Sequence, residues 1–388
     1  MLDQGGEKNI NSIIGIVLIF AILIGYSIYT QPSPEQIEAA KMKRDSLEAA
    51  LNAQQTNVEA RSETNEARVE QQSARDESTG SFQSQTDSTS SFEVLQKYGE
   101  FHEAALGEEQ LLTMENEVVR ITLSTKGGGL HSVELKNYKT FDSLPVYLIK
   151  DLGEKDDGTD LCEFNMIFFS GTKTIATRDM FFKPKGSSFT VDGNNTKTLS
   201  LRLYVGDDQD DKYIEYQYSL AGNSYILDFK MHFHGVEDEI AMNNNYLRFD
   251  WTNFIPRQEK SLINEQRNST IYYKYYKDEV DYLSETSDES EDLRTKVKWV
   301  AFKQQFFASI LVAETSFDKP TNIESIASEE NGEYVKEMRA SFTIPYGHQR
   351  DETFPMFFYF GPTHYKTLQE YGLDFEKVVP LGWGIFGW

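Results

Sequence analysis

The chain opens with a long hydrophobic run, continues through a polar stretch and then alternates between apolar and polar positions. No charged residue lies between Lys8 and Glu35, and the run from Ile10 to Tyr29 is mostly isoleucine, leucine, valine and phenylalanine. About 20 apolar residues in a helix span the roughly 30 Å hydrocarbon core of a bilayer. We therefore expect a transmembrane helix over residues 10–30, after a short N-terminus of residues 1–9. Its expected anchor residues are Ile10, Ile14, Leu18, Phe20, Leu23, Tyr26 and Tyr29.

Two other interpretations of this run fit the sequence less well. A cleaved signal peptide has a shorter apolar run, a basic front and a small-residue cleavage site. Here the front is nearly neutral, and no A-x-A pattern follows the run. A buried core helix would have amphipathic neighbours to cover it, whereas the following residues are polar. We expect an uncleaved membrane anchor.

Residues 31–106 are predicted to form a polar stalk and tether. Ser33, Pro34 and Gln36 give the pattern of a helix start, and we expect a solvated helix as far as about residue 72. The stretch after it is rich in Ser, Thr, Gln and Asp, which bury too little apolar area to offset the entropy lost on ordering. It is expected to be disordered.

Strand signals dominate residues 107–375. The clearest hairpin joins residues 213–220 to 225–234, and in its second arm Leu227, Phe229 and Met231 alternate with polar residues. We expect a large antiparallel β domain, because helices do not alternate with the strands. Further strand-like runs cover residues 118–124, 130–138, 146–149, 162–169, 188–191, 198–205, 246–251, 271–276, 302–313, 338–344 and 354–360.

Three shorter features interrupt this pattern. Gly127, Gly128 and Gly129 are predicted to form a structural turn that needs positive φ. The acidic segment 284–292 is expected to be a solvated excursion, and residues 363–372 a short helix that ends at a glycine.

Residues 376–388 contain three aromatic residues interspersed with glycines. Trp383, Phe386 and Trp388 suit a membrane interface, where amphipathic rings lie at the level of the lipid headgroups. The alternative is a last apolar strand of the β domain. We expect the beginning of an interfacial membrane helix.

The charge of the chain limits the classes of partner that it can bind. Lys and Arg number 38 and Asp and Glu 62, giving a formal net charge of −24. Such a surface repels phosphate backbones, which argues against nucleic-acid binding. The single cysteine, Cys162, excludes an intramolecular disulfide. Basic residues on the two sides of residues 10–30 do not decide which side of the membrane each end occupies.

The sequence contains no G-x-S-x-G, H-E-x-x-H or Walker-type pattern. His232 and His234 are two residues apart, so they share one face of a strand and could chelate a metal ion. No acidic or cysteine partner is identifiable from the sequence, and we interpret both as surface histidines. We expect no catalytic, cofactor-binding or metal-binding residues, and a protein that is not an enzyme.

Four segments, taken in order, resemble the YidC family of membrane protein insertases of Gram-negative bacteria. They are Met114-Glu115-Asn116 with the strand and glycines after it, Trp299–Ala308 (WVAFKQQFFA), Phe358–Pro362 (FYFGP) and Leu381-Gly382-Trp383. Each segment alone is a weak signal, but their order and spacing make the resemblance specific.

The resemblance implies a fold, a location and partners. The β domain would be a periplasmic supersandwich, similar in shape to galactose-mutarotase folds but without their catalysis. The chain would lie in the inner membrane with its N-terminus in the cytoplasm. It would assist the insertion and folding of nascent membrane-protein clients in the lipid bilayer, alone or with the Sec translocon.

The family's insertion groove, made by further membrane helices, would lie beyond Trp388, so we expect the sequence to be a fragment or a truncated chain. The alternative function is a membrane-anchored periplasmic carbohydrate-binding or mutarotase-like protein.

Overall fold

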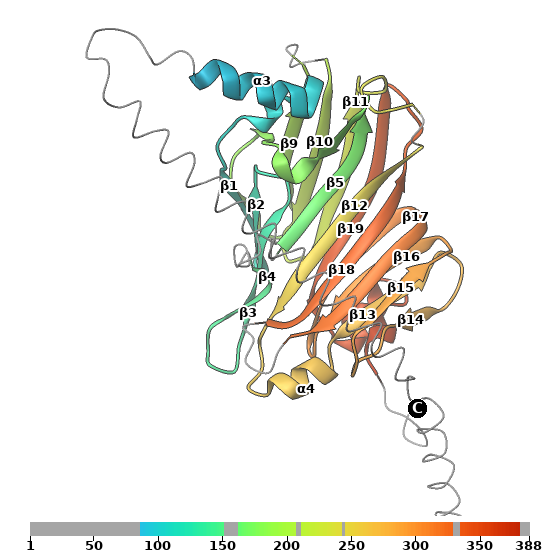
Figure 1. Ribbon diagram of the computed structural model, residues 1–388. Helices are drawn as coiled ribbons and strands as arrows, with labels where there is room; N and C mark the ends of the chain where they lie inside the picture. The colour runs from blue at the N-terminus through green and yellow to red at the C-terminus, as the bar shows by residue number, and fades with distance from the viewer. Residues whose placement is uncertain (1–85, 151–161, 207–210, 243–244, 329–333, 381–388) are drawn as a thin grey trace, which may run out of the picture. The chain divides into compact units, whose positions relative to one another are not determined.

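The computed structural model describes residues 86–150, 162–206, 211–242, 245–328 and 334–380, all within one compact unit, Gln83–Trp388. Strands account for most of it (Figure 1). The predicted mainly β, antiparallel architecture is confirmed, with one parallel pair between β1 and β8. The helices are α3 (Thr86–Tyr98), α4 (Leu262–Arg267) and α5 (Tyr365–Glu370), with short 3-10 helices η1 (Gly99–Phe101), η2 (Glu103–Ala105), η3 (Thr177–Asp179) and η4 (Phe375–Val378).

The smaller sheet has the strand order β4-β3-β2-β1-β8. Its β2 and β3 pair antiparallel across the predicted glycine turn, so this hairpin is found where the alternation placed it. The strands are β1 (Leu111–Glu115), β2 (Val119–Ser124), β3 (Leu130–Lys139), β4 (Pro145–Lys150) and β8 (Phe189–Thr190).

The larger sheet has the main order β6-β5-β12-β18-β17-β19-β11-β10-β9-β7, and β13 to β16 extend it beside β17. Its strands are β5 (Cys162–Ser170), β6 (Lys173–Ala176), β7 (Lys183–Lys185), β9 (Thr196–Tyr204), β10 (Tyr213–Ala221), β11 (Ile226–His234), β12 (Tyr246–Pro256), β13 (Thr270–Tyr275), β14 (Val280–Tyr282), β15 (Glu289–Leu293), β16 (Val297–Lys303), β17 (Phe307–Ala327), β18 (Tyr334–Pro345) and β19 (Asp351–Pro362).

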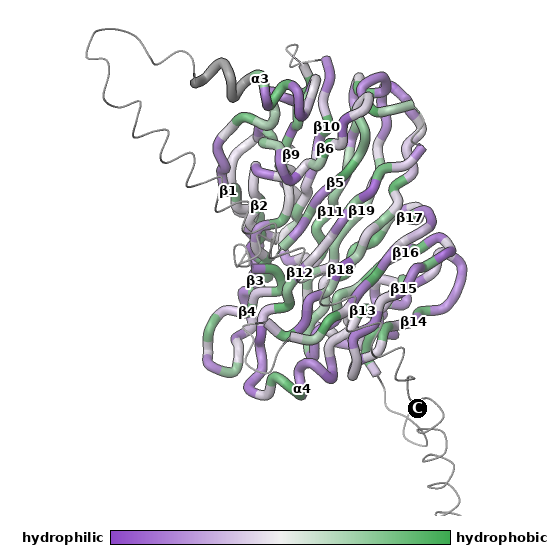
Figure 2. Tube along the Cα trace, viewed as in Figure 1, coloured by the Kyte–Doolittle hydropathy of each residue, from purple (hydrophilic) through white to green (hydrophobic). Residues whose placement is uncertain are grey.

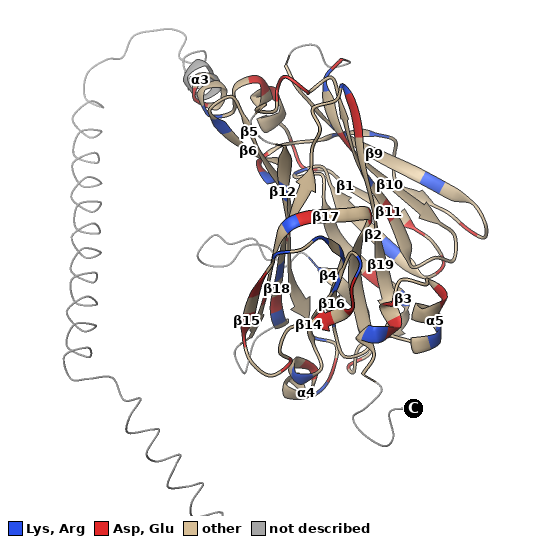
Figure 3. Cartoon of the chain, turned by 90° about the vertical axis from the view of Figure 1, so that its right-hand side faces the viewer, with Lys and Arg blue, Asp and Glu red and all other residues tan. Residues whose placement is uncertain are grey.

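The larger sheet curls so that its two halves face each other, with β5, β12 and β18 on one side and β10, β11 and β19 on the other (Figure 3). Aromatic rings fill the space between them. Phe164 on β5 lies 5.3 Å from Phe229 on β11 and 4.8 Å from Phe249 on β12, between ring centroids. The alternation of green and purple along the strands reflects one buried and one polar face (Figure 2). Burial of these rings is the main source of the domain's stability.

One strand belongs to both halves. The first part of β17, from Phe307 to Ala313, pairs with β19, and its second part, from Asn322 to Ala327, pairs with β18. The strand is 21 residues long. It therefore carries the sheet from one layer into the other.

Three predictions about element boundaries need correction. The predicted tether extends to residue 106, but α3, η1 and η2 lie between residues 86 and 105, and Phe101 is fully buried with its ring 5.2 Å from Phe168. The run 302–313 is two strands, because the chain turns between Lys303 and Phe307. The acidic segment 284–292 is not wholly a loop: β15 pairs with β17 and ends in the buried Leu293.

Candidate functional site

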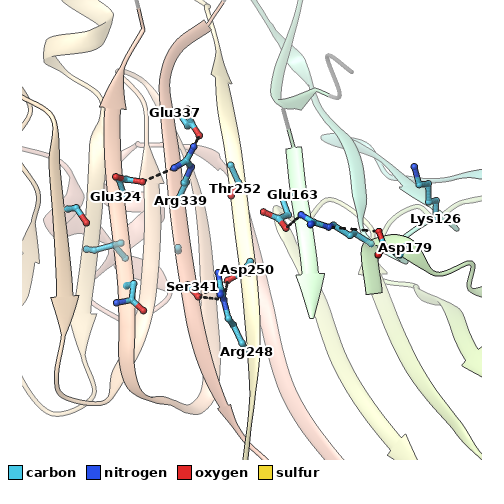
Figure 4. Close-up of a pocket in the computed structure, with 15 residues that line it drawn as sticks. Lys126, Glu163, Asp179, Arg248, Asp250, Thr252, Glu324, Glu337, Arg339 and Ser341 are labelled. Carbon is cyan, nitrogen blue, oxygen red and sulfur yellow. Dashed lines mark hydrogen bonds and ion pairs between the residues drawn. The ribbon is translucent and has the colours of Figure 1, made fainter. Parts of the chain in front are cut away.

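A polar groove of about 770 Å³ lies on the face of the larger sheet that points away from the aromatic core (Figure 4). The strands β5, β12, β17 and β18 supply most of its floor. It is lined by Lys126, Glu163, Arg178, Asp179, Arg248, Asp250, Thr252, Ser290, Asn322, Ile323, Glu324, Glu337, Arg339, Ala340 and Ser341.

Strand register brings these residues together from distant parts of the chain. Thr252 on β12 pairs with Glu163 on β5 and with Arg339 on β18, and Arg339 pairs in turn with Glu324 on β17. These four residues form a row across four neighbouring strands. Because side chains alternate along a strand, Phe249 and Trp251 of β12 point into the core while Asp250 and Thr252 face the groove.

Ion pairs fix the groove's charged side chains. The Arg339 guanidinium binds Glu324 at 2.9 Å and also binds Glu337, between which it lies in Figure 4. Arg248 binds Asp250 at 2.8 Å, and the Ser341 hydroxyl donates to the same Asp250 oxygen at 2.6 Å. Each arginine is thus held in place by a carboxylate on the sheet.

A third pair lies at the β5 side of the groove. Arg178 binds Glu163 at 2.9 Å, and the Asn165 amide donates to the same carboxylate at 3.1 Å. The backbone N–H of Arg178 donates to Asn165 Oδ1 at 3.1 Å, which ties η3 to β5. This pair is therefore supported by the backbone as well as by charge.

The groove is nearly neutral on a strongly acidic chain. Its lining holds four basic and five acidic side chains, whereas the whole chain carries a formal net charge of −24. A surface of paired charges offers both donors and acceptors without repelling either sign of charge. Its chemistry suits binding of an extended polar segment.

The predicted site residues fall into two groups. The anchor residues, from Ile10 to Tyr29, and the interfacial residues Trp383, Phe386 and Trp388 lie outside the described residues. Within the described ranges, no helix is both long and apolar enough to cross a membrane.

The glycine turn is described. Gly127 has φ +77° and Gly128 has φ +71°. Gly129 does not have a positive φ. A Cβ there would lie 2.6 Å from the Cβ of Phe164, so close packing, and not backbone conformation, excludes a side chain at this position. This turn holds Lys126 at the edge of the groove.

Three of the four segments that carry the family resemblance lie within the described residues and connect parts of the fold, whereas Leu381-Gly382-Trp383 lies outside them. The Asn116 side chain accepts hydrogen bonds from the backbone N–H groups of Val118 and Val119. Its amide donates to the carbonyls of Ala221 and Ser224 at 2.7 and 2.8 Å. Asn116 therefore fastens the smaller sheet to the tip of the β10–β11 hairpin.

A second group of these residues packs against α5 and η4. The indole of Trp299 and the ring of Tyr359 lie in a cluster with the buried Leu368, Phe375 and Val378. The Tyr359 hydroxyl donates to the Pro362 carbonyl at 2.7 Å. Both aromatic residues belong to the segments quoted for the resemblance, and their role is to seat α5 and η4.

The groove is not predictable from the sequence. Polar residues at alternate positions of β12 and β18 were a usable signal for an outward face, as Arg248, Asp250, Arg339 and Ser341 illustrate. No local pattern in the sequence indicates that these two strands are neighbours.

Comparison with known proteins gives one family. The family model described as "YidC periplasmic domain" matches residues 111–386. The chain is 30% identical over 387 residues to the membrane protein insertase YidC of Parabacteroides distasonis and 33% identical over 389 residues to that of Phocaeicola vulgatus. These alignments cover 97% of the chain but 57% and 56% of the relatives, so the chain spans little more than half of their length.

Among solved structures, the fold is similar to a galactose mutarotase related enzyme from Lactobacillus acidophilus, with a TM-score of 0.38, 8% identity and coverage of 65% of this chain and 97% of that one. It is also similar to a galactose mutarotase-like protein from Lactobacillus casei, with a TM-score of 0.37, 8% identity and coverage of 65% and 100%.

Proposed function

Because the chain belongs to the YidC family, we propose that it is part of a membrane protein insertase, which assists other proteins in inserting and folding in the inner membrane. The observation that carries this proposal is the family-model match over residues 111–386. The proposed partners are the lipid bilayer, nascent membrane-protein clients and the Sec translocon. The curated relatives reported above carry the insertase name and do not favour a carbohydrate-binding or mutarotase-like function.

The proposed topology has three parts. Residues 10–30 cross the inner membrane with the N-terminus in the cytoplasm, the β domain lies in the periplasm, and residues 376–388 begin an interfacial helix. The hydrophobic run supports the first part, and the family description supports the second. The third is supported by the aromatic composition of the final residues and by the seating of η4 in the preceding cluster.

The polar groove extends this proposal to the β domain itself. In the proposed topology, client segments that are translocated to the periplasm would emerge on the same side of the membrane as the β domain. The paired arginines and carboxylates of the groove give such segments donors and acceptors at fixed positions. We assign the groove the role of a transient contact for them.

Depletion tests the insertase function. The gene for this chain is placed under a regulated promoter in its own bacterium, and newly made membrane proteins are followed by their resistance to alkaline extraction. Depletion is expected to lower the integrated fraction of multispanning proteins and to leave exported soluble proteins unchanged, and re-expression restores integration. Unchanged integration after complete depletion would refute the proposal.

Cysteine labelling tests the topology separately. Cys162 is the only cysteine, so replacing it with serine gives a background in which one new cysteine reports its own location. Glu279 is exposed, and Glu279→Cys on this background is expected to react with a membrane-impermeant maleimide in spheroplasts. Labelling only after lysis would place the β domain in the cytoplasm and contradict the topology without bearing on insertion.

A further inference from the structure

Two histidines and an aspartate converge on the face of the paired strands β11 and β19, which lie side by side (Figure 2). The antiparallel register sets His234 opposite Asp351 and His232 opposite Thr353. Because side chains alternate along a strand, His232 and His234 share one face, and Asp351 joins them there. The two histidines expose about a quarter of their side chains, 26% and 24%, so the cluster is open to solvent on one side.

The distances within the cluster are short enough for a single ion. His234 Nδ1 lies 2.5 Å from Asp351 Oδ1, and His232 Nε2 lies 3.8 Å from the same oxygen. One possible ligand atom from each residue lies within 4.8 Å of the other two. His234 Nδ1 and Asp351 Oδ1 are hydrogen-bonded to each other, and side-chain rotations that separate them and draw His232 Nε2 closer would bring all three atoms to the 2.0–2.2 Å bond lengths of zinc.

The neighbours of the histidines orient them toward this point. His232 Nδ1 lies 2.9 Å from the Thr353 hydroxyl oxygen. In the tautomer in which Nδ1–H donates to that hydroxyl, Nε2 keeps its lone pair and faces Asp351. Metal-binding histidines are commonly held in this way, with the second ring nitrogen donating to an oxygen.

Two neighbours of the cluster on β10, Tyr213 and Glu215, do not compete for its three donors. The ring of Tyr213 on β10 stacks on His234 with centroids 5.0 Å apart. Glu215, which lies opposite His232 on β10, is bound to Arg202 at 2.8 Å. Its carboxylate is therefore engaged elsewhere.

We propose that His232, His234 and Asp351 form a binding site for a divalent transition-metal ion of the Zn²⁺ type. Two imidazole nitrogens and one carboxylate oxygen suit Zn²⁺, Co²⁺ or Ni²⁺, whereas Ca²⁺ and Mg²⁺ prefer sets of oxygen ligands. Three protein ligands leave at least one coordination position on the solvent side, open to water or to a donor from another molecule. The site lies on β11 and β19 and shares no residue with the polar groove.

Cobalt titration of the full chain in detergent tests this site, because Co²⁺ in a four-coordinate protein site absorbs visible light far more strongly than hydrated Co²⁺. After chelator treatment, one equivalent of Co²⁺ is expected to bind and to be displaced by Zn²⁺. His234→Ala and Asp351→Asn are each expected to weaken the apparent affinity at least tenfold. Thr353→Val, which removes only the orienting hydroxyl, is expected to weaken it about tenfold.

His364→Ala is the matched control, because His364 is an exposed histidine that contacts Thr367 in the α5 region. It is expected to leave the titration unchanged. Circular dichroism verifies that every variant is folded. Absence of a stoichiometric cobalt spectrum in the folded wild-type chain would overturn the proposal, as would equal affinities in His234→Ala and His364→Ala, which indicate adventitious binding. Neither result depends on insertion activity.

Discussion

The indole N–H of Trp299 donates to the backbone carbonyl of Leu373 at 2.9 Å. Trp299 is fully buried on β16, and its ring meets Phe375 edge-on with centroids 5.7 Å apart. This contact fixes the segment between α5 and η4 against the sheet. η4 is therefore held at a defined place on the β domain.

Replacing Trp299 with phenylalanine tests the contact. The variant leaves the Leu373 carbonyl without its donor and opens a small cavity, which we expect to cost about 2 kcal/mol of unfolding free energy. Limited trypsin digestion should then cleave faster at Lys366 and Lys377. Phe306→Leu, at a ring that is 52% exposed, is the control and should match the wild type. Unchanged cleavage in Trp299→Phe would show that the indole does not hold this segment.

Gly128 provides a test of the turn between β2 and β3. Its φ of +71° is unfavourable for a β-branched residue, and a Cβ there would meet ring atoms of Phe182 and Tyr216 at 3.0 Å. Gly128→Val is expected to lower the unfolding free energy by about 1 kcal/mol or more, measured by urea denaturation. Gly347→Ala is the control, because its φ is not in the left-handed region and its added methyl meets only the Glu352 carboxylate at 3.4 Å or more. Equal midpoints for the two variants would argue against a conformational requirement at Gly128.

Glu265 is expected to make stability depend on pH. Burial raises the pKa of this carboxyl from its ordinary value of 4.5 to about 7, although the backbone N–H groups of Gln258 and Glu259 oppose the shift by donating to it. Between pH 4.5 and 7 the folded chain therefore binds more protons here than the unfolded chain. Its contribution to stability is full below pH 4.5 and falls as the pH rises to 7, by roughly 3 kcal/mol.

The Glu265→Gln variant isolates this contribution because it cannot ionise. Relative to the wild type, it should gain stability between pH 4.5 and 7.5, as measured by urea denaturation at both values. Glu370→Gln, at an exposed carboxyl on α5, should show no comparable gain. A constant difference between Glu265→Gln and wild type at the two pH values would contradict the prediction.

Photo-crosslinking tests the groove. A benzophenone side chain in place of Arg248, which is 60% exposed in the groove, should form adducts with nascent membrane proteins in cells. Asp250 keeps its hydrogen bond from Ser341 in this variant, so the sheet is expected to remain folded. The same side chain in place of the exposed Lys197 on β9 is the control. Adducts of equal yield at both positions would mean that the groove has no preference for clients.

The alternation of residues predicted most strands but not which strands are neighbours. The β10–β11 hairpin was predictable because its two arms are adjacent in sequence and its period is two. The turn between β16 and β17 was not, because Gln304 and Gln305 carry no glycine or proline signal. The helical end of the expected tether was missed because Phe101 is one buried ring in a polar region.

The sites depend on pairings that local sequence does not encode. Asp351 lies 117 residues after His234, and only the register of β11 with β19 brings the two together. The groove likewise depends on Thr252, Glu163 and Arg339 meeting on three strands that are distant in sequence. Composition and period identify the faces of strands, whereas long-range pairing decides which faces share a site.

The shared strand β17 connects the two layers through one continuous backbone. Its first part pairs with β19 in one layer, and its last part pairs with β18 in the other layer. Removing either layer would leave half of β17 with unpaired backbone groups, which are costly to expose or bury. A load applied to the chain through either layer is therefore passed along one continuous backbone to the other. We therefore expect the two layers of the β domain to unfold together under such a load, in a single step.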